Sequence, residues 1–434
     1  MTPLHRLDIA ALRAADAVAV TEAYLDRIAR FDGQLYAFTA VDADGARVAA
    51  AESARRIAGG EARVLEGVPV AIKANIALRG LATTAGVAAR RGAVAEADAA
   101  VVTRLRDAGA VILGHVNMHE AALGATTDNT AYGRTENAHA AGHTPGGSSG
   151  GSGAAVAAGL CAVALGTDTL GSVRIPAAYN GVYGLKPTNG MVDDCGVVPL
   201  DRRLDCVGPL ARSVADLAAF MAVLAPIGAA TPLRRIATLG VVDDYADTEP
   251  AVRDAHALAQ SLLRGLGYSV DRHAPPGLDL TAARIGGFVQ SARAAAHEFA
   301  ADAALADGIS PGFRAMLSYG AAATPEVLAH GAAAMAAAKA ALDAVLLDAD
   351  AILMPTCPQV AFAHGRAPVT QADFTALANL AGLPALSLPA GWSADGLPVG
   401  VQLVGRAGSE ASLLALAAEL DAALGGYRFP IGYS

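Results

Sequence analysis

The fold is decided by residues 145–188, which read PGGSSGGSGAAVAAGLCAVALGTDTLGSVRIPAAYNGVYGLKPT. The first part, residues 146–153, holds only glycine and serine. Glycine permits positive φ angles and lets the backbone approach a ligand closely. A second turn, DTLGSVR at 168–174, follows a short apolar run. A serine in such a turn can present its hydroxyl while backbone N–H groups converge on one point, as a nucleophile and an oxyanion hole require.

A lysine stands at the end of an apolar run upstream of this stretch. The segment GVPVAIKANI (67–76) predicts a buried strand with Lys73 near its end. A lysine can act as a base only when neutral, so its pKa must fall from about 10.4 toward ~7–8, which burial can achieve. Such a fall costs roughly 4 kcal/mol. The alternative, on composition alone, is a lysine whose charged head reaches the surface.

Apolar periodicity along the rest of the chain indicates alternating helices and strands. Strands are predicted at 68–73, 110–115, 162–166, 237–242, 350–354, 385–389 and 399–404. Helices are predicted at 8–31, 42–58, 97–108, 151–160, 213–225, 250–267 and 408–424, with an Ala-rich helical region at 280–350. This alternation favours α/β architecture. Because no repeat or linker interrupts the chain, one sheet that gathers all these strands is the simplest arrangement.

The composition of the 434-residue chain excludes several classes of protein. Hydrophobic residues make up 53% and charged residues 17%. Disordered chains have the opposite balance, with low hydrophobicity and high net charge. The net charge is −9, and no basic stripe is present. Nucleic acid is therefore not expected as the main ligand, because phosphate binding needs clustered lysine and arginine.

Three further features predict a cytoplasmic protein that is not bound to a membrane. The first residues, MTPLHRLDIAALRAAD, carry arginine and aspartate within the apolar run, unlike a signal peptide. The longest uncharged stretch, 144–167, begins with glycine, serine and proline rather than with the apolar residues of a membrane span. Four cysteines, at 161, 195, 206 and 357, show no CxxC spacing and are expected to be free thiols in a reducing compartment.

Taken together, these motifs resemble the amidase signature family over nearly the whole chain. The resemblance also includes NMHEAALG (117–124), NTAYGRTEN (129–137), RLDCVGPLARSVADL (203–217) and NLAGLPALSLPAG (379–391). It implies an α/β fold in which helices cover both faces of a central mixed, twisted sheet. It further implies one domain over 1–434, with the signature core at about 65–210 and a variable, substrate-determining helical region at about 280–350.

The resemblance assigns catalytic roles by position. Ser172 resembles the nucleophile, Ser148 the bridging serine, which in the family has an unusual cis peptide bond, and Lys73 the general base. A serine hydroxyl needs a base to take its proton, and the Ser148 hydroxyl can relay that proton because it both donates and accepts. The oxyanion hole would come from the backbone N–H groups of Thr169, Leu170, Gly171 and Ser172.

The sequence departs from the family pattern at two positions beside these residues. Leu170 stands where glycine is usual, and Ala74 where an acidic residue commonly follows the lysine. The leucine keeps its backbone N–H but can narrow the pocket, and the alanine removes a charge near Lys73. We expect both departures to affect the range of substrates more than the catalytic residues themselves.

The residues expected to contact the substrate are less well marked in the sequence. The candidates are Met118, Tyr132, Gly147, Arg174, Arg314 and Tyr319. Arg174 or Arg314 could bind a substrate carboxylate with two parallel hydrogen bonds. For Arg174, the sequence favours the alternative of a structural ion pair with a carboxylate such as Asp168.

The resulting prediction is a hydrolase of a small carboxamide that releases ammonia or an amine through an acyl-enzyme. No metal or organic cofactor is implied, and His119, His139 and His143 lack the spacing of a metal site. The expected partner is a small-molecule amide, and a homodimer is possible. Two alternatives within the family are a glutaminase subunit of a tRNA-dependent amidotransferase and a hydrolase of a urea derivative such as allophanate. A non-catalytic protein of the same fold is the third.

Overall fold

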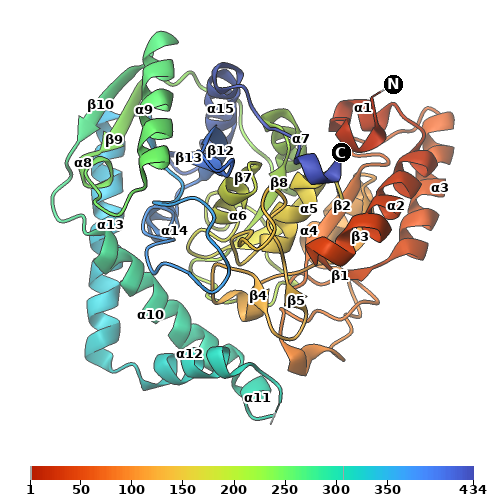
Figure 1. Cartoon of the computed structure of the whole chain (residues 1–434), viewed down its shortest axis with the longest axis horizontal. Helices are drawn as coiled ribbons and strands as arrows, with labels where there is room; N and C mark the ends of the chain where they lie inside the picture. Colours follow the sequence, from red (N-terminus) through yellow and green to blue (C-terminus); the bar gives the residue numbers. More distant parts are fainter. Residues whose placement is uncertain (1, 306) are drawn as a thin grey trace.

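Eleven strands form one mixed sheet in the computed structural model of the chain, which describes residues 2–305 and 307–434 (Figure 1). Their order across the sheet is β1 (Phe38–Val41), β3 (Val111–Val116), β2 (Pro69–Lys73), β6 (Val163–Asp168), β8 (Cys206–Ala211), β7 (Tyr183–Lys186), β12 (Ala385–Trp392), β13 (Pro398–Gly405), β11 (Ala351–Pro355), β9 (Arg235–Leu239) and β10 (Ser269–His273). A separate hairpin pairs β4 (Asp128–Asn129) with β5 (Gly133–Arg134).

Two parallel groups of strands stand out in this sheet. β2 runs parallel to β3 and β6, and β9 runs parallel to β10 and β11. The remaining pairs are antiparallel. The carboxyl ends of parallel strands meet at one edge of a sheet, where α/β proteins bind their ligands. Lys73, which ends β2, is therefore brought beside Asp168, which ends β6.

Helices cover both faces of the sheet, as the alternation of side chains along β11 illustrates. Ala351 and Leu353 belong to the apolar cluster that includes α9 (Pro250–Gly265) and α15 (Glu410–Leu424). Ile352 and Met354 belong to the cluster that includes α13 (Pro325–Asp348) and α14 (Ala376–Ala381). Successive residues of a strand point to opposite faces, so both faces are buried. The predicted α/β fold with helices on both faces is confirmed.

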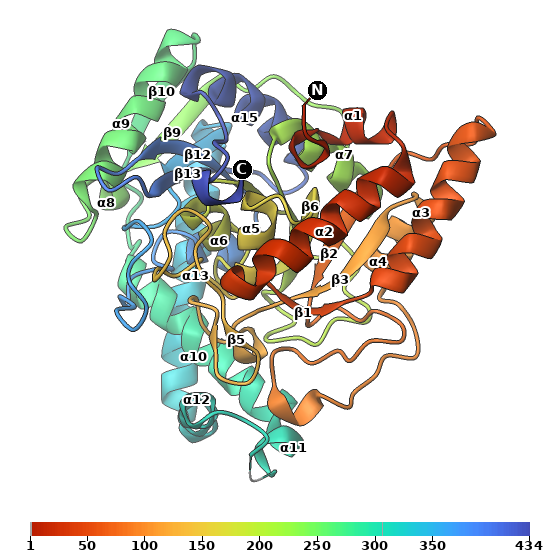
Figure 2. The same cartoon turned by 45° about the vertical axis from the view of Figure 1, so that its right-hand side comes forward.

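The other helices are arranged around this layered core. They are α1 (Ile9–Arg13), α2 (Ala17–Leu35), α3 (Ala43–Ala58), α4 (Ala100–Asp107), α5 (Gly150–Ala157), α6 (Arg174–Tyr179), α7 (Val214–Leu224), α8 (Gly240–Asp243), α10 (Leu280–Glu298), α11 (Ala300–Ala303) and α12 (Pro311–Ala322). Four 3₁₀ turns are η1 (Leu4–Arg6), η2 (Ala88–Arg90), η3 (Glu120–Ala122) and η4 (Ile431–Tyr433). Figure 2 shows α2 in front of β2 and β3, with α10 and α12 at the bottom of the view.

The structure corrects several expected elements. β1, β7, β8 and β10 were not predicted; Gly184 in β7, and Gly208 and Pro209 in β8, interrupt the runs that mark a strand. The strand predicted at 237–242 ends at Leu239, where α8 begins. The helix predicted at 8–31 is divided into two, because the Asp16 side chain accepts hydrogen bonds from the first N–H groups of α2.

One helix, α13, is long and apolar enough to cross a membrane by length and composition alone. A buried helix of a folded core meets the same criterion. Leu342, Val345 and Leu346 on one face of α13 pack in the cluster formed with β9 and β11. Gly331 meets Gly286 of α10 backbone to backbone, so the two helices cross at close range.

We predict that two glycine-to-alanine substitutions will have opposite effects. A Cβ on Gly151 of α5 would lie 2.4 Å from Asn117 O and 2.7 Å from Ala37 O, and backbone atoms cannot easily move. Gly151→Ala should therefore lower the free energy of unfolding by about 1–3 kcal/mol. Gly33 of α2 has nothing within 4 Å of the same position, so Gly33→Ala should raise it by about 1 kcal/mol. Urea unfolding of both variants measures this, and equal effects would contradict the packing described.

Candidate active site

Lys73 is fully buried at the carboxyl end of β2. Its Nζ shares hydrogen bonds with Ser148 Oγ at 2.7 Å and with Thr167 Oγ1 at 2.8 Å. Burial lowers the pKa of the Lys73 amine to about 7, while the carboxylates of Asp205 and Asp168 act in the opposite direction. The amine is therefore available as a neutral base near neutral pH.

The glycine-serine loop that carries Ser148 is held by the segment before it. The Gly147–Ser148 peptide bond is cis. Thr127 Oγ1 donates to Gly146 O at 2.8 Å, and His119 N donates to Ser148 O at 3.0 Å. The polar stretch from 117 to 129 thus fixes the loop from outside, and Ser148 itself is completely buried.

Ser172 lies in the turn that connects β6 to α6. Gly171, the residue before it, has a φ of 131°, a conformation that favours glycine. Ser149 N donates to Ser172 O at 3.2 Å, which joins the two serine-containing segments. Unlike Lys73 and Ser148, Ser172 is partly accessible, at 8% exposure, and it lines a cavity. Its hydroxyl is therefore the one that a substrate can reach.

The backbone N–H groups of this turn are not all available to a substrate. Gly171 N donates to Asp168 Oδ1 at 2.7 Å, so its N–H is already engaged, which corrects the expectation of four oxyanion donors. Within residues 2–305 and 307–434, the N–H groups of Thr169, Leu170 and Ser172 have no hydrogen-bond partner. Three donors of the predicted set therefore remain free beside the Ser172 hydroxyl.

Arg174 is a structural residue rather than a substrate contact. Its Nε and Nη2 donate to Oδ2 and Oδ1 of Asp168, each at 3.0 Å, and both side chains are fully buried. The guanidinium also donates to Asn379 Oδ1 at 2.6 Å and to Gln402 Oε1 at 2.8 Å. Burial tends to raise the pKa of Asp168, but the Arg174 guanidinium outweighs it and lowers that pKa to about 2. The ion pair expected from the sequence is confirmed, and the candidate role of Arg174 in carboxylate binding is not supported.

Asp205 connects the Ser172 turn to the loop on its other side. Thr169 Oγ1 donates to Asp205 Oδ1 at 2.5 Å, and Leu200 N donates to Asp205 Oδ2 at 2.8 Å. Burial raises the pKa of this carboxyl to about 6. Leu200 is also a wall of the cavity, so Asp205 fixes one cavity wall relative to the turn.

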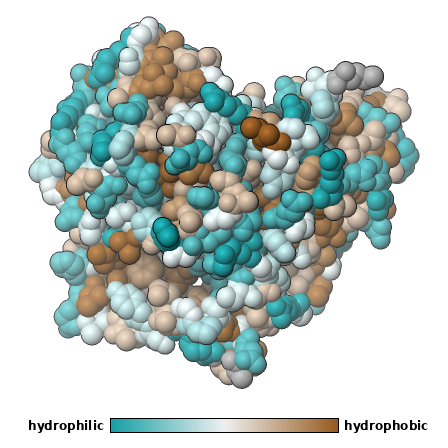
Figure 3. Space-filling view, in the orientation of Figure 1, coloured by the Kyte–Doolittle hydropathy of each residue, from teal (hydrophilic) through white to brown (hydrophobic). Residues whose placement is uncertain are grey.

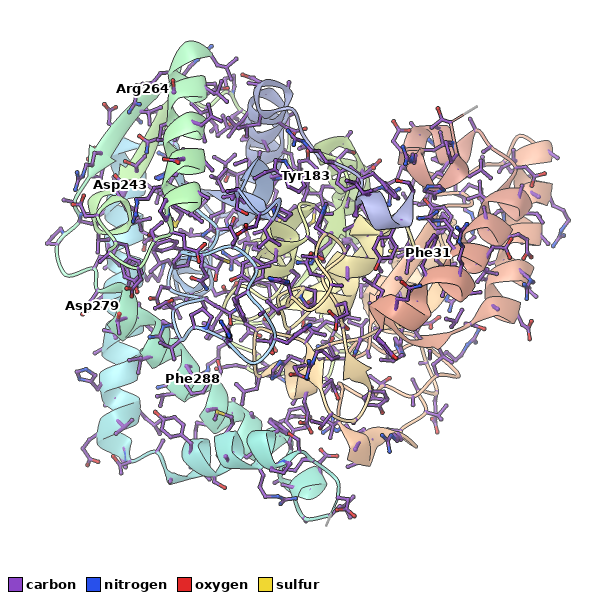
Figure 4. All side chains as sticks on the ribbon, viewed as in Figure 1. Phe31, Tyr183, Asp243, Arg264, Asp279 and Phe288 are labelled. Carbon is purple, nitrogen blue, oxygen red and sulfur yellow. The ribbon has the colours of Figure 1, made fainter. Side chains whose placement is uncertain are left out.

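The cavity at Ser172 has a volume of about 330 Å³ and is mostly apolar. Its lining residues are Ala122, Leu123, Gly124, Ala125, Thr169, Leu170, Ser172, Ile175, Leu200, Arg284, Phe288, Ser291, Pro368, Val369, Gln371 and Ala372. Phe288, labelled in Figure 4, comes from α10, and the face drawn in Figure 3 is hollowed in this region. The size suits a small ligand, and the lining favours apolar groups.

Two polar side chains of the cavity differ in how they are satisfied. Arg284 forms an ion pair with Asp373, so its charge is neutralised. Asp373 also accepts a hydrogen bond from the Tyr245 hydroxyl. Ser291 of α10 is fully buried, and its hydroxyl has no partner within residues 2–305 and 307–434. The cavity therefore offers the unpartnered Ser291 hydroxyl in addition to that of Ser172, and the charge of Arg284 is already paired.

The remaining predicted substrate contacts lie outside the cavity. Met118 is buried in the apolar cluster behind it, and Gly147 packs against the backbone of Ala125 and Thr126. The Arg314 guanidinium donates to Ala303 O and Leu305 O at the end of α11. Tyr132 stacks with Arg91, and Tyr319 lies 48% exposed on the outer side of Phe288. None of the five is among the residues that line the cavity.

Sequence reasoning missed several residues that support or line the site. Thr167 is the residue before Asp168, at the end of the buried strand β6. Its place at the end of an apolar run, like that of Lys73, is the signal by which the sequence could have identified it. Asn379 and Gln402, the other partners of Arg174, come from segments more than two hundred residues away. The cavity walls Leu123, Leu200 and Ser291 carry no local signal.

Comparisons with known proteins show which proteins this chain is similar to. A family model described as Amidase matches residues 19–414. A glutamyl-tRNA(Gln) amidotransferase subunit from Anaeromyxobacter dehalogenans is 39% identical over 473 positions, covering 96% of this chain and 94% of that protein. The peptide amidase of Stenotrophomonas maltophilia is 30% identical, with a TM-score of 0.85 and 99% of each chain covered. A solved structure described as an amidase is 31% identical, with a TM-score of 0.89 and coverage of 96% and 100%.

We predict that Lys73 makes stability depend on pH above neutrality. The unfolded chain holds the lysine proton up to a pKa of 10.5, whereas the folded protein releases it near 7. The unfolded state therefore binds more protons between these values, and stability rises with pH there. Relative to Lys73→Met, the native protein should gain about 4 kcal/mol at most between about pH 7 and pH 10. Urea unfolding of both proteins across this range measures the difference, and parallel pH curves would contradict the burial of a neutral amine.

Proposed function

This chain belongs to the amidase family, and from that premise we propose that it hydrolyses small carboxamides with an apolar acyl group. Enzymes of this family cleave carbon–nitrogen bonds. The observation that carries the proposal is the buried Lys73–Ser148 hydrogen bond, together with the accessible Ser172, whose carbonyl accepts from Ser149 N, the residue after Ser148. The proposed catalytic residues are Lys73, Ser148 and Ser172.

In the proposed reaction, protons move along the three side chains. Ser148 gives its proton to the neutral Lys73 amine and takes the proton of Ser172, whose oxygen attacks the amide carbon. The resulting lysine charge is tolerated because Asp205 and Asp168 favour the protonated amine. The same path returns a proton to the leaving nitrogen, so ammonia or an amine departs and an acyl-enzyme remains. Water, deprotonated along the same path, then releases the acid.

In the proposed reaction, backbone N–H groups stabilise the negative charge that develops on the amide oxygen. The free N–H groups of Thr169, Leu170 and Ser172 are the proposed oxyanion hole. Fixed donors of this kind stabilise the tetrahedral intermediate without reorganising during the reaction. The turn that carries them is fixed by the Asp168 carboxylate, which accepts from Gly171 N and Val173 N.

The character of the cavity defines the proposed substrate class. Leu123, Leu170 and Phe288 are among its walls, and its guanidinium, Arg284, is already paired. A substrate carboxylate would lose its water there without gaining a free cation, which costs several kcal/mol. We therefore favour uncharged aliphatic or aryl amides over carboxylated amides and over charged urea derivatives such as allophanate.

A second candidate is the glutaminase subunit of a tRNA-dependent amidotransferase. The names of the relatives favour it, since several glutamyl-tRNA(Gln) amidotransferase subunits match at 34–39% identity. Two observations weigh against it. The alignment with the Anaeromyxobacter dehalogenans protein spans 473 positions, more than the 434 residues of this chain, so that relative carries segments that this chain lacks. Glutamine would also bring a carboxylate and an ammonium into the apolar cavity.

The first test measures ammonia release from a panel of primary amides. We expect release from uncharged aliphatic or aryl amides, and Ser172→Ala should reduce it by roughly 10⁵-fold or more. Ser152→Ala is the matched control, because the Ser152 hydroxyl donates to Leu165 O and takes no part in the proposed path. Release from glutamine alone, increased by added amidotransferase subunits, would support the second candidate. No release from any amide, together with no labelling of Ser172 by a serine-directed phosphonate, would refute catalysis.

A further prediction from the proposed function concerns Leu170, where the family usually has glycine. Its side chain lies against Gly287 of α10 and lines the cavity. Leu170→Ala keeps the backbone N–H but enlarges the cavity. We expect kcat/KM to rise about tenfold for a bulky aryl amide and to fall similarly for a small aliphatic one. Val369→Ala, at an exposed part of the rim, should change neither value. A uniform loss with all amides would instead show that Leu170 shapes the turn.

A further inference from the structure

A second cavity, of about 400 Å³, lies at the carboxyl ends of β9, β10 and β11. Thr238 near the end of β9, Arg272 near the end of β10 and Pro355 at the end of β11 all line it. These three strands are parallel to one another. The edge cavity, as we call it, thus occupies the position at which open parallel sheets bind ligands. Figure 4 places Asp243 and Arg264, which line it, in the part of the molecule away from Phe288.

Three arginines surround the edge cavity. Arg253 and Arg264 come from α9, and Arg272 comes from β10. Arg253 donates to Thr248 O, and Arg264 Nη2 donates to Val270 O at 3.1 Å, so backbone carbonyls orient both guanidiniums without neutralising their charge. Arg272 lies over the backbone of Gly240, where a Cβ would be 2.9 Å from its Nε.

The negative charge at the edge cavity is smaller than the positive charge. Arg272 pairs with Asp244, which is mostly exposed, and its Nε lies 3.9 Å from Asp243. Arg253 and Arg264 form no ion pair within residues 2–305 and 307–434. Two carboxylates therefore face three guanidiniums, which favours an anionic ligand in a protein whose net charge is −9.

The floor of the edge cavity contains buried polar atoms that lack partners. Thr248 Oγ1, His256 Nε2 and Asp243 Oδ1 have no hydrogen-bond partner within residues 2–305 and 307–434. Thr248 is 4% exposed and His256 is 5% exposed. His256 Nδ1 and Asp243 Oδ1 are 3.6 Å apart, too far for a good hydrogen bond. Buried polar atoms are nearly always hydrogen-bonded. Three such atoms without a partner in one cavity therefore indicate a ligand that supplies their hydrogen-bond partners.

We propose that the edge cavity binds a small anion that carries a carboxylate or phosphate group together with a hydroxyl. The anionic group would lie against Arg253 and Arg264. The hydroxyl would pair with the orphaned atoms of Thr248, His256 or Asp243 on the floor. The edge cavity shares no lining residue with the cavity at Ser172, so this site is separate from the proposed amide-cleaving site.

The test is calorimetric titration of the full chain at low ionic strength, with inorganic phosphate and with malate, a hydroxy dicarboxylate, as separate probes. We expect at least one probe to bind, and the stronger probe identifies phosphate or carboxylate as the recognised group. Arg253→Gln combined with Arg264→Gln should weaken binding at least about tenfold. Arg79→Gln, an exposed arginine elsewhere on the chain, is the matched control and should bind as the native protein does.

A second variant separates binding from a purely structural role. Thr248→Val keeps the shape of the side chain and the backbone carbonyl that accepts from Arg253, but it removes the unpaired hydroxyl. Removal of a buried, unpaired hydroxyl should leave the thermal unfolding midpoint of the free protein unchanged or higher. The affinity for malate should nevertheless fall several-fold. Failure of both probes to bind the native protein, or equal binding by the double arginine variant, would overturn the proposal. Ser172→Ala should retain binding, so this outcome does not depend on the proposed amidase activity.

Discussion

The buried ion pair between Asp168 and Arg174 holds the Ser172 turn in place. Asp168 Oδ1 accepts from Gly171 N, Arg174 Nη2 and Asn379 Nδ2, and Oδ2 accepts from Val173 N and Arg174 Nε. Every donor on the carboxylate therefore comes from the turn, from the first residue of α6 or from α14. A buried pair contributes little net stability, but the loss of one partner costs about 3–5 kcal/mol because the other charge stays buried. The pair thus specifies one conformation of the turn, and the oxyanion donors depend on that conformation.

The same pair also affects the base. Lys73 ends the strand next to the one that ends in Asp168, and an unpaired carboxylate there would favour the charged amine. Burial is nevertheless the larger influence on Lys73 and lowers the pKa of the amine to about 7, while the Asp205 and Asp168 carboxylates act in the opposite direction. Ala74 also helps to keep the pKa of the Lys73 amine low. It is buried in an apolar cluster with Met118 and Phe313, where an acidic residue would have brought another negative charge close to the amine.

The sequence predicted local features well and distant ones poorly, for physical reasons. The strand that ends at Lys73 is marked by the length of its apolar run, and the two turns are marked by where their glycines stand. Both signals lie within a few neighbouring residues, and the structure contains all three features. Strands β7 and β8 were missed because pairing with neighbours stabilises segments whose glycine and proline weaken any local preference. Arg314 and Tyr319 were placed in the correct helical region, but helix periodicity does not say which face meets the cavity.

The proposed catalytic side chains and several residues that line the cavity come from different parts of the sequence, which explains why similar chains can differ in substrate. The proposed catalytic side chains lie on β2, on the turn after β6 and on the loop before α5, all within one continuous part of the sequence. Several cavity walls come from other segments: Leu200 lies in the loop before β8, Phe288 belongs to α10, and Gln371 lies in the loop before α14. Substitutions in these walls change the size and polarity of the cavity without disturbing the base or the nucleophile. Identity of 39% over the whole chain is therefore compatible with retained amide cleavage and a changed substrate, and here the paired Arg284 and the apolar walls point away from a charged one.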